Sequence, residues 1–313
     1  MTTWKVLITD GLSDKGIAIL SSAAQVDNKP DISADDLLKV AGEYDAIVVR
    51  GRTKVTPAVF EAAKKLRVVG RAGVGVDNID LTAARSKGVT VVNAPKSTSL
   101  AVAELALGMM FCLARMIPKA DYTMKQGQWI KKQLEGIELN GKTLGIVGMG
   151  NIGTAIAHKA AALGMKTLGY DTLVSTEEIK KRGAEPTTLV DLYAKSDFIT
   201  FHLPLSPESK GMVNGQAFAQ MKRGVRIIDA ARGGIIDETA LVAALETGQV
   251  AAAALDVFAT EPPGSTALVA HPNVVATPHI GAQTEEAQDR AAEDIASEVL
   301  NVLRGDPLRW KIV

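Results

Sequence analysis

A glycine motif is the clearest sign of chemistry in this sequence. Gly148, Gly150 and Gly153 have the spacing Gly-x-Gly-x-x-Gly, and they lie between an apolar run and a helical pattern. In that setting the first glycine permits a tight turn, the second lets a pyrophosphate approach the backbone, and the third lets helix and strand pack closely. The N–H groups of Asn151 and Ile152 would face the phosphates at the positive end of the helix dipole. The motif therefore predicts a dinucleotide-binding site.

An acidic residue follows at the position that such a site requires. Asp171 ends the next strand-like run, 18 residues after Gly153. A carboxylate there accepts a hydrogen bond from a ribose 2′-hydroxyl and repels a 2′-phosphate. The next residue is Thr172 and not arginine, which favours NAD over NADP. The alternative reading of Asp171 is a turn or helix-capping residue.

Three further side chains each follow an apolar, strand-like run in the second half of the chain: Arg232, Glu261 and His279. Hydride removal from an alcohol carbon leaves a proton behind, and near neutral pH histidine is the usual group to accept it. A carboxylate at Glu261 would orient the imidazole, and the planar guanidinium of Arg232 suits a substrate carboxylate. The set predicts redox chemistry on a small hydroxy acid.

The other histidines are weaker candidates. His158 lies within a helical pattern and His271 in a loop, so we expect both at the surface. His202 ends a strand-like run, where it would line the cofactor pocket.

Alternating strand and helix patterns predict the elements that must position these residues. The first hundred residues and the segment after 142 each form such a series, which is typical of parallel sheets covered by helices on both faces. A long apolar helix is predicted at 99–116 between them. The predicted strands are 5–9, 45–49, 67–70, 89–92, 143–147, 166–170, 198–202, 225–228, 252–255 and 274–277. The predicted helices are 13–23, 34–40, 57–64, 81–87, 152–163, 237–247 and 284–303.

These series predict an α/β protein with two doubly wound domains. Residues 97–283 would form a Rossmann-type NAD-binding domain. Residues 1–96 and 284–313 would form a smaller, discontinuous, flavodoxin-like domain that binds the substrate, with the ligands in the cleft between the two.

Composition excludes several classes of partner and site. Lys plus Arg and Asp plus Glu both number 35, so neither nucleic acid nor an anionic membrane surface is expected as a partner. The single cysteine, Cys112, permits no intrachain disulfide, and no Cys/His cluster predicts a metal. No run of about 18 apolar residues and no signal sequence is found, so we expect a cytoplasmic protein.

Several longer stretches resemble one family, the D-isomer-specific 2-hydroxyacid dehydrogenases, over essentially the whole chain. They include 69–78, 140–148, 198–205, 229–237, 254–258 and 261–263. The resemblance is strongest to members that oxidise 3-phospho-D-glycerate to 3-phosphohydroxypyruvate, the first step of serine biosynthesis. It implies that His279 is the acid/base, that Glu261 is its partner, and that Arg232 polarises the carbonyl and binds the carboxylate.

The same resemblance implies the residues that surround the ligands. Asp256 would contact the nicotinamide end of NAD, and the backbone N–H groups of Gly73, Val74 and Gly75 would bind the substrate carboxylate. The remaining residues implied beside the cofactor are His202, Leu203, Pro204, Ala230 and Ala282.

Arginines at predicted strand ends concern the substrate. A lone arginine is usually a surface residue, but the resemblance implies that Arg50 and Arg71 hold phosphate and carboxylate groups. Arg52 departs from the family pattern Arg-Ser-x-Thr-Lys-Val, because this chain reads Arg50-Gly-Arg-Thr-Lys-Val55. The extra cation would strengthen a dianion site or reshape it for another acid, such as a sulfonate. Lys131 also stands where close relatives carry arginine, in a segment that would reach the partner subunit.

Assembly and alternatives follow from the same resemblance. We expect a homodimer or dimer-based tetramer through 99–116 and its flanks. We expect no regulatory domain and no feedback by serine, because the chain ends soon after its last helix. The alternatives are a dehydrogenase for glyoxylate, hydroxypyruvate or sulfolactate, an NAD(H)-sensing corepressor-like protein, and an enzyme for a formate-like substrate.

Overall fold

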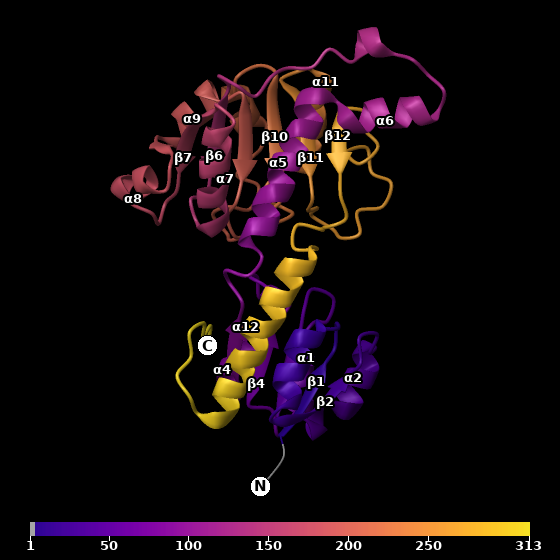
Figure 1. The fold of residues 1–313 in the computed structure, drawn as a ribbon, viewed down its shortest axis with the longest axis vertical. Helices are drawn as coiled ribbons and strands as arrows, with labels where there is room; N and C mark the ends of the chain where they lie inside the picture. The colour runs from indigo at the N-terminus through magenta and orange to yellow at the C-terminus, as the bar shows by residue number, and fades with distance from the viewer. Residues whose placement is uncertain (1–3) are drawn as a thin grey trace. The chain divides into compact units, whose positions relative to one another are not determined.

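The first series of predicted strands forms a parallel sheet in the computed structural model, which describes residues 4–313 (Figure 1). Its order, β2-β1-β3-β4-β5, is that of flavodoxin-like folds. The strands are β1 (Trp4–Ile8), β2 (Ala24–Asn28), β3 (Ala46–Val49), β4 (Val68–Arg71) and β5 (Thr90–Asn93). Residues 1–3, at the start of the segment in which we expect no signal sequence, lie outside the described part.

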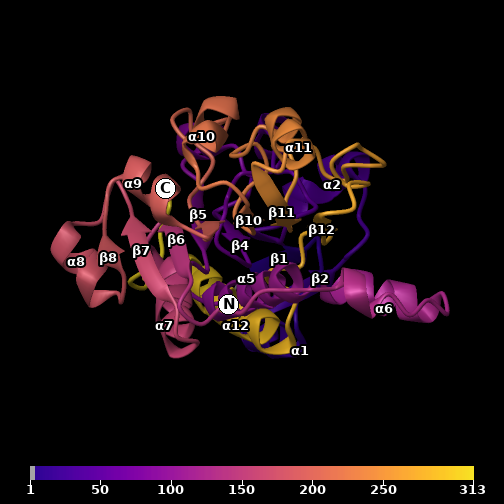
Figure 2. The same ribbon diagram turned by 90° about the horizontal axis from the view of Figure 1, so that it is seen from above.

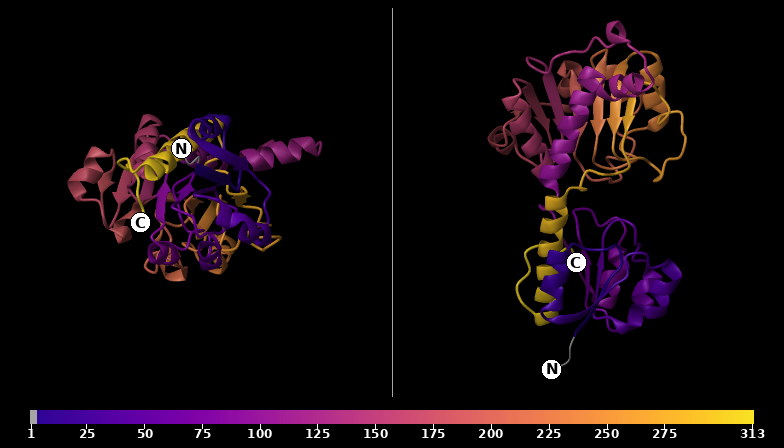
Figure 3. Two further views of the ribbon diagram at one scale, coloured as in Figure 1. Left: turned by 90° about the horizontal axis from the view of Figure 1, so that it is seen from below. Right: turned by 45° about the vertical axis from the view of Figure 1, so that its right-hand side comes forward.

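Helices cover both faces of this sheet because successive strand residues point to opposite sides. In β1, Val6 and Ile8 pack with α1 and α12, whereas Leu7 packs on the other face with α2, α3 and α4. Helix α12 lies alongside α1, as the right-hand view of Figure 3 shows. The helices are α1 (Asp14–Ser21), α2 (Ala34–Val40), α3 (Pro57–Ala62), α4 (Leu81–Lys87) and α12 (Glu285–Arg304), with a 3-10 turn, η1, at Ala41–Glu43.

The second series forms a seven-stranded parallel sheet in the order β12-β11-β10-β9-β6-β7-β8. This is the dinucleotide-binding order, in which the strand order reverses between β6 and β9. Ligands bind at the carboxyl ends of the strands beside such a reversal. The strands are β6 (Thr143–Val147), β7 (Lys166–Tyr170), β8 (Glu185–Pro186), β9 (Phe198–Phe201), β10 (Val225–Asp229), β11 (Val250–Leu255) and β12 (Val274–Ala276).

Two apolar layers hold this second sheet. One layer joins it to α5, α7 and α8, and the other joins it to α9, α10 and α11, on the opposite face (Figure 2). The helices are α5 (Ser99–Arg115), α6 (Ile117–Lys125), α7 (Asn151–Ala162), α8 (Thr176–Lys181), α9 (Leu189–Lys195), α10 (Gly215–Gln220) and α11 (Glu238–Glu246), with a 3-10 turn, η2, at Lys131–Gln133.

The described chain divides into two compact units. The first contains the residues up to Ser99 together with Ala282–Val313, and the second contains Leu100–Gly281. The two helix-covered parallel sheets confirm the predicted α/β class. No single helix within residues 4–313 is long and apolar enough to cross a membrane, and α5 and α6 pass that test only together, across a bend of 66°.

Some elements differ from the sequence prediction. The predicted strands and helices are all present, with ends that match or shift by one or two residues, but β2, β8, α6, α8, α9 and α10 were not predicted. The second sheet therefore has seven strands where we expected six. Strands β2 and β8 lie at the edges of their sheets, where one side of the strand has no neighbouring strand to select an apolar pattern.

Candidate active site

The glycine loop between β6 and α7 has the shape that a pyrophosphate needs. Gly148 has a φ of 97°, and a side chain there would collide with the carbonyl of His202. A side chain at Gly153 would collide with the Gly148 carbonyl, so this glycine permits the close approach of helix and strand. Gly150, the N-cap of α7, has no heavy atom within 4 Å of the position of an added Cβ. That open side lies at the N-terminus of a 12-residue helix, where backbone N–H groups favour an anion.

Asp171 lies beside this loop at the end of β7. Its Oδ2 accepts a hydrogen bond from the Met149 N–H at 2.7 Å, and its Oδ1 accepts from the N–H groups of Leu173 at 2.8 Å and Val174 at 3.2 Å. A carboxylate offers about four acceptor positions, so about one remains for a ribose hydroxyl. The carboxylate therefore shapes the glycine loop and still fits NAD.

The loop after β9 approaches the glycine loop at the strand reversal. His202 Nε2 lies 2.7 Å from Thr200 Oγ1, and burial lowers the pKa of the His202 ring to about 3. The imidazole is therefore neutral near pH 7, and its Nδ1 is shielded from solvent without a hydrogen-bond partner among residues 4–313. Leu203 is half-buried, and Pro204 is exposed with its carbonyl accepting from Ser209 Oγ at 2.7 Å.

Three consecutive strands, β10, β11 and β12, each carry one predicted catalytic residue in the loop at their carboxyl end. Arg232 follows β10, Glu261 follows β11, and His279 follows β12. His279 Nδ1 lies 2.8 Å from Glu261 Oε2, and Glu261 Oε1 accepts from the Phe258 N–H at 3.2 Å. The imidazole is half exposed, at 50%. With Nδ1 held by the carboxylate, Nε2 is the ring atom left to exchange a proton.

The backbone around His279 is held by Asp256. This residue is 1% exposed, and its Oδ1 accepts from Thr277 Oγ1 at 2.6 Å and from the Ile280 N–H at 2.8 Å. Its Oδ2 accepts from the Gly281 N–H at 2.8 Å. His279 itself has a φ of 53°, in the left-handed region that few side chains adopt. The buried carboxylate thus fixes both sides of the turn that presents the imidazole, while its predicted contact with nicotinamide stays a prediction.

Arg232 lies in a turn that is shaped by Asp229. Asp229 is 2% exposed, and its Oδ1 accepts from the Ala231 N–H at 2.8 Å. Burial raises the pKa of Asp229 to about 7, although the Arg232 charge opposes that rise. The Arg232 Nη1 donates to the Ala231 carbonyl at 2.6 Å. Ala230, between the strand and this turn, is buried.

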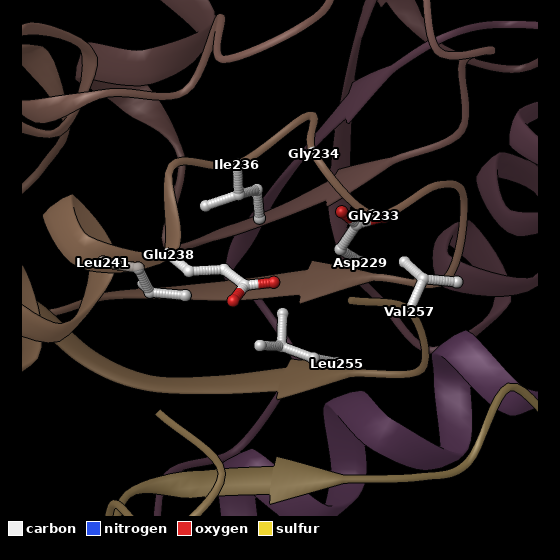
Figure 4. A pocket seen from close by; sticks show the side chains of 8 residues that line it. All are labelled: Asp229, Gly233, Gly234, Ile236, Glu238, Leu241, Leu255 and Val257. Carbon is white, nitrogen blue, oxygen red and sulfur yellow. The ribbon is translucent and has the colours of Figure 1, made fainter. Parts of the chain in front are cut away.

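The turn of Arg232 packs directly against the loop that leads to Glu261. A side chain at Gly233 would collide with the Phe258 carbonyl, so only glycine permits this approach. Glu238, at the start of α11, accepts from the Ala259 N–H through Oε1 at 2.7 Å. Figure 4 shows Glu238 reaching into the small pocket that Asp229 and Gly233 also line. Sequence reasoning assigned no role to Asp229 or Glu238, although Asp229 begins the stretch 229–237 and Glu238 follows it.

The predicted substrate residues lie in the first unit. Arg50 follows β3 and Arg71 ends β4, at the carboxyl ends of two paired strands. Desolvation lowers the pKa of Arg50, whose Nη2 donates to Gln283 Oε1 at 3.3 Å. Arg71 Nη1 donates to the Ala72 carbonyl at 2.8 Å, and it occupies the space that a side chain at Gly73 would fill.

The following turn is tied to β5 and leaves one of its residues exposed. The Val74 carbonyl accepts from Asn93 Nδ2 at 2.7 Å, and the Gly73 carbonyl accepts from the Ala94 N–H at 3.0 Å. Val74 is exposed and Gly75 is half-buried. Ala282 also belongs to the first unit, whereas the other residues predicted to contact NAD lie in the second. Within residues 4–313, no group of three or more His, Cys, Asp or Glu side chains is placed to hold a metal ion.

Comparison with known proteins agrees with this geometry. Residues 107–281 match the family model of the D-isomer specific 2-hydroxyacid dehydrogenase, NAD binding domain. The D-3-phosphoglycerate dehydrogenase of Rattus norvegicus is 49% identical over 97% of this chain, and the chain spans 57% of the length of that relative.

Solved structures match over the full length. A protein of Thermus thermophilus is 32% identical, with a TM-score of 0.89 and coverage of 99% of this chain and 100% of that one. A glyoxylate reductase from Paecilomyes thermophila is 29% identical, with a TM-score of 0.90 and coverage of 100% and 99%. The chain therefore belongs to the D-isomer-specific 2-hydroxyacid dehydrogenase family, and its second unit contains the NAD-binding domain of that family.

Proposed function

We propose that this chain oxidises 3-phospho-D-glycerate to 3-phosphohydroxypyruvate with NAD, and catalyses the reverse reduction. The observation that carries the proposal is the set of three side chains on consecutive loops of one sheet edge, in which His279 and Glu261 lie 2.8 Å apart. An acid/base, its orienting carboxylate and a guanidinium are the groups that oxidation of a hydroxy acid requires.

Bound NAD would accept the hydride from C2 of the hydroxy acid. In our proposal His279 removes the proton of the C2 hydroxyl group through Nε2, and it returns that proton in the reverse direction. Glu261 accepts the Nδ1–H of His279, which orients the ring and leaves Nε2 directed at the substrate. Arg232 binds the substrate carboxylate and polarises the carbonyl oxygen of the product, for which its planar fork is suited.

The residues around the glycine loop would hold NAD in this scheme. The N–H groups of Asn151 and Ile152 would face the pyrophosphate, which the open side of Gly150 would admit, while Gly148 and Gly153 permit the turn and the close packing of α7. Asp171 accepts a ribose hydroxyl. We assign further contacts with NAD to His202, Leu203, Pro204, Ala230, Asp256 and Ala282.

The first unit would bind the substrate. We assign the phosphate and carboxylate groups to the cations Arg50 and Arg71 and to the backbone of Gly73–Gly75. The identity of 49% with a D-3-phosphoglycerate dehydrogenase supports a phosphorylated substrate. The structural similarity to a glyoxylate reductase supports a second candidate, a smaller 2-oxo acid such as glyoxylate or hydroxypyruvate, for which two cations are more than are needed.

A homodimer or a tetramer built from dimers is our proposal for the assembly. Five apolar side chains on α5, α6 and the following loop are at least 39% exposed: Phe111, Ile117, Tyr122, Met124 and Trp129. Helix α6 extends away from the sheet of its unit in both Figures 2 and 3. Large apolar side chains that are exposed together on neighbouring segments are typical of an interface. The lone Cys112 suits a reducing compartment, and we propose the cytoplasm.

A matched substrate pair tests the proposed reaction. Purified protein with NADH should reduce 3-phosphohydroxypyruvate with a kcat/KM at least about tenfold above that for hydroxypyruvate, because the two acids differ only in the phosphate that the cations would bind. A preference for hydroxypyruvate or glyoxylate would replace the first candidate by the second. Tight NADH binding with no turnover of any 2-oxo acid would favour a sensing role.

A further inference from the structure

The guanidinium of Arg52 is directed at the backbone of two neighbouring loops. Its Nη2 donates to the carbonyls of Thr9 at 2.5 Å and Pro30 at 2.7 Å, and its Nη1 donates to the carbonyl of Ile32 at 3.0 Å. Nη2 also lies 3.2 Å from Asp10 Oδ1. Both terminal nitrogens are therefore engaged within the protein. One arginine joins the loops that follow β1, β2 and β3, which are adjacent in the sheet.

Asp10 binds the same 50–53 loop through its carboxylate. Its side chain is only 4% exposed. Its Oδ2 accepts from the N–H groups of Arg50 at 2.7 Å and Thr53 at 3.1 Å, and its Oδ1 accepts from Thr53 Oγ1 at 2.5 Å. A buried carboxylate with four donors is stable only while those donors stay in place, because its desolvation is otherwise uncompensated.

Asn78, from the loop after β4, holds the same segment by its carbonyls. Its Nδ2 donates to the Arg50 carbonyl at 3.0 Å and to the Thr53 carbonyl at 2.6 Å. Both backbone polar groups of Arg50 and both of Thr53 are thus bonded to side chains from other loops. The segment 50–53 has no helix or strand of its own, and these side chains take the place of a regular hydrogen-bond ladder.

We propose that Arg52 is a positioning residue: it fixes the 50–53 loop so that Arg50 is presented in one conformation to the phosphate of the substrate, and it does not bind the substrate itself. The effect on substrate binding rests on the proposed function, whereas the ordering of the 50–53 loop by Arg52 does not. It replaces the expectation that Arg52 is an additional cation for the ligand. We call this set of contacts, in which Arg52 and Asp10 hold the 50–53 loop, the clamp.

The physical gain lies in preorganisation. A long arginine side chain loses rotamer freedom when it binds an anion, and a mobile backbone beneath it adds to that entropic cost. Holding the backbone beforehand removes the second contribution. Arginine suits this clamp better than lysine, because its planar fork reaches several carbonyls at fixed angles.

Amide hydrogen exchange of the ligand-free protein tests the clamp without any assay of activity. In Arg52→Ala, the amides of Ile32, Arg50 and Thr53 should exchange about tenfold faster or more, while amides of β6 in the second unit keep their rates. Arg52→Lys should lie between the two, because one ammonium can replace only part of the fork. Arg85→Ala is the matched control, since Arg85 is exposed on α4 and its loss changes the charge equally.

Steady-state reduction then tests the consequence for the substrate. In Arg52→Ala the KM for 3-phosphohydroxypyruvate should rise about tenfold, the KM for hydroxypyruvate should change less than about threefold, and both kcat values should stay near wild type. Arg52→Lys should recover part of the KM. Unchanged exchange at Arg50 and Thr53 in Arg52→Ala overturns the clamp, and a raised KM with unchanged exchange identifies Arg52 as a direct ligand. If exchange accelerates as expected but wild type prefers hydroxypyruvate, the clamp stands and the proposed substrate fails.

Discussion

At the scale of single residues, burial shifts the pKa values of two groups of the second unit in opposite directions. Burial raises the pKa of Asp229 from 3.8 to about 7, so the folded protein keeps a proton there that the unfolded chain releases. Burial lowers the pKa of His202 from 6.5 to about 3, so the folded protein lacks a proton that the unfolded chain binds. By linkage, the Asp229 contribution to stability is lost as pH rises from about 4 to 7. The His202 contribution is lost as pH falls from about 6.5 to 3.

Substitution should separate the two contributions. The melting temperature of Asp229→Asn, measured relative to wild type, should increase as pH rises from 4 to 7. That of His202→Gln, measured in the same way, should increase as pH falls from 6.5 to 4. Thermal melts over this pH range provide the measurement. Curves of both variants that run parallel to the wild-type curve would show that neither group has the shifted pKa described here.

The proposed catalytic residues could be predicted from the sequence because each follows a strand. Arg232, Glu261 and His279 could be predicted at one sheet edge from strand order alone, and the structure places Glu261 and His279 in contact. The tasks of Asp256 and Glu238 were not predictable in the same way. A carboxylate can accept from any nearby N–H group, so its partners depend on loop conformations that no local pattern determines.

At the scale of elements, substitution by alanine should affect two glycines of the β6–α7 turn differently. Gly150→Ala should leave the melting temperature within about 2 °C of wild type, because the space around it is open, and raise the KM for NAD about tenfold or more. Gly153→Ala should lower the melting temperature strongly, because the new side chain meets the Gly148 carbonyl. Calorimetry and NAD titration of both variants test this contrast. Equal losses of stability would contradict it.

The loops after β10 and β11 are joined by Glu238, so we expect its loss to affect catalysis. Glu238→Ala frees the Ala259 N–H and should lower kcat about tenfold, because the adjoining Glu261 loop loses a constraint. Glu238→Gln keeps an acceptor and should stay within about threefold of wild type. Asp237→Ala is the control: it removes the N-cap of α11 and should cost about 1 kcal/mol of stability with kcat unchanged. Identical kcat values for Glu238→Ala and wild type would refute this role.

The prediction of elements succeeded where periodicity is strong. Strands β6 and β7 were predicted with their observed ends, because apolar β-rich runs there stop at turn residues. The six-residue helices α8 and α10 are too short for a hydrophobic period to be read, and they depend on capping by Ser175 and Asn214. Strand β2 reads Ala-Gln-Val-Asp-Asn, which is a weak strand sequence that becomes extended only through pairing with β1.

At the scale of the whole molecule, the exposed apolar side chains of α5 and α6 predict self-association. Sedimentation should give a mass of at least twice 33.0 kDa for the wild-type chain. The double variant Ile117→Glu with Trp129→Ala should sediment as a monomer, because it places charge in the proposed interface. Val190→Glu, at an exposed apolar position on α9, should leave the mass unchanged. A wild-type mass of 33.0 kDa would remove the proposed interface.

Proton exchange at His279 is the claim on which the proposed chemistry depends. Asparagine tolerates the left-handed backbone at this position, so His279→Asn should fold like wild type and keep its affinity for NADH. The most direct measurement is the kcat for 3-phosphohydroxypyruvate reduction by this variant, beside His158→Asn on the exposed face of α7 as the control. We predict a loss of about 10²–10⁴-fold for His279→Asn and none for His158→Asn. A His279→Asn variant that turns over within about threefold of wild type would contradict the account.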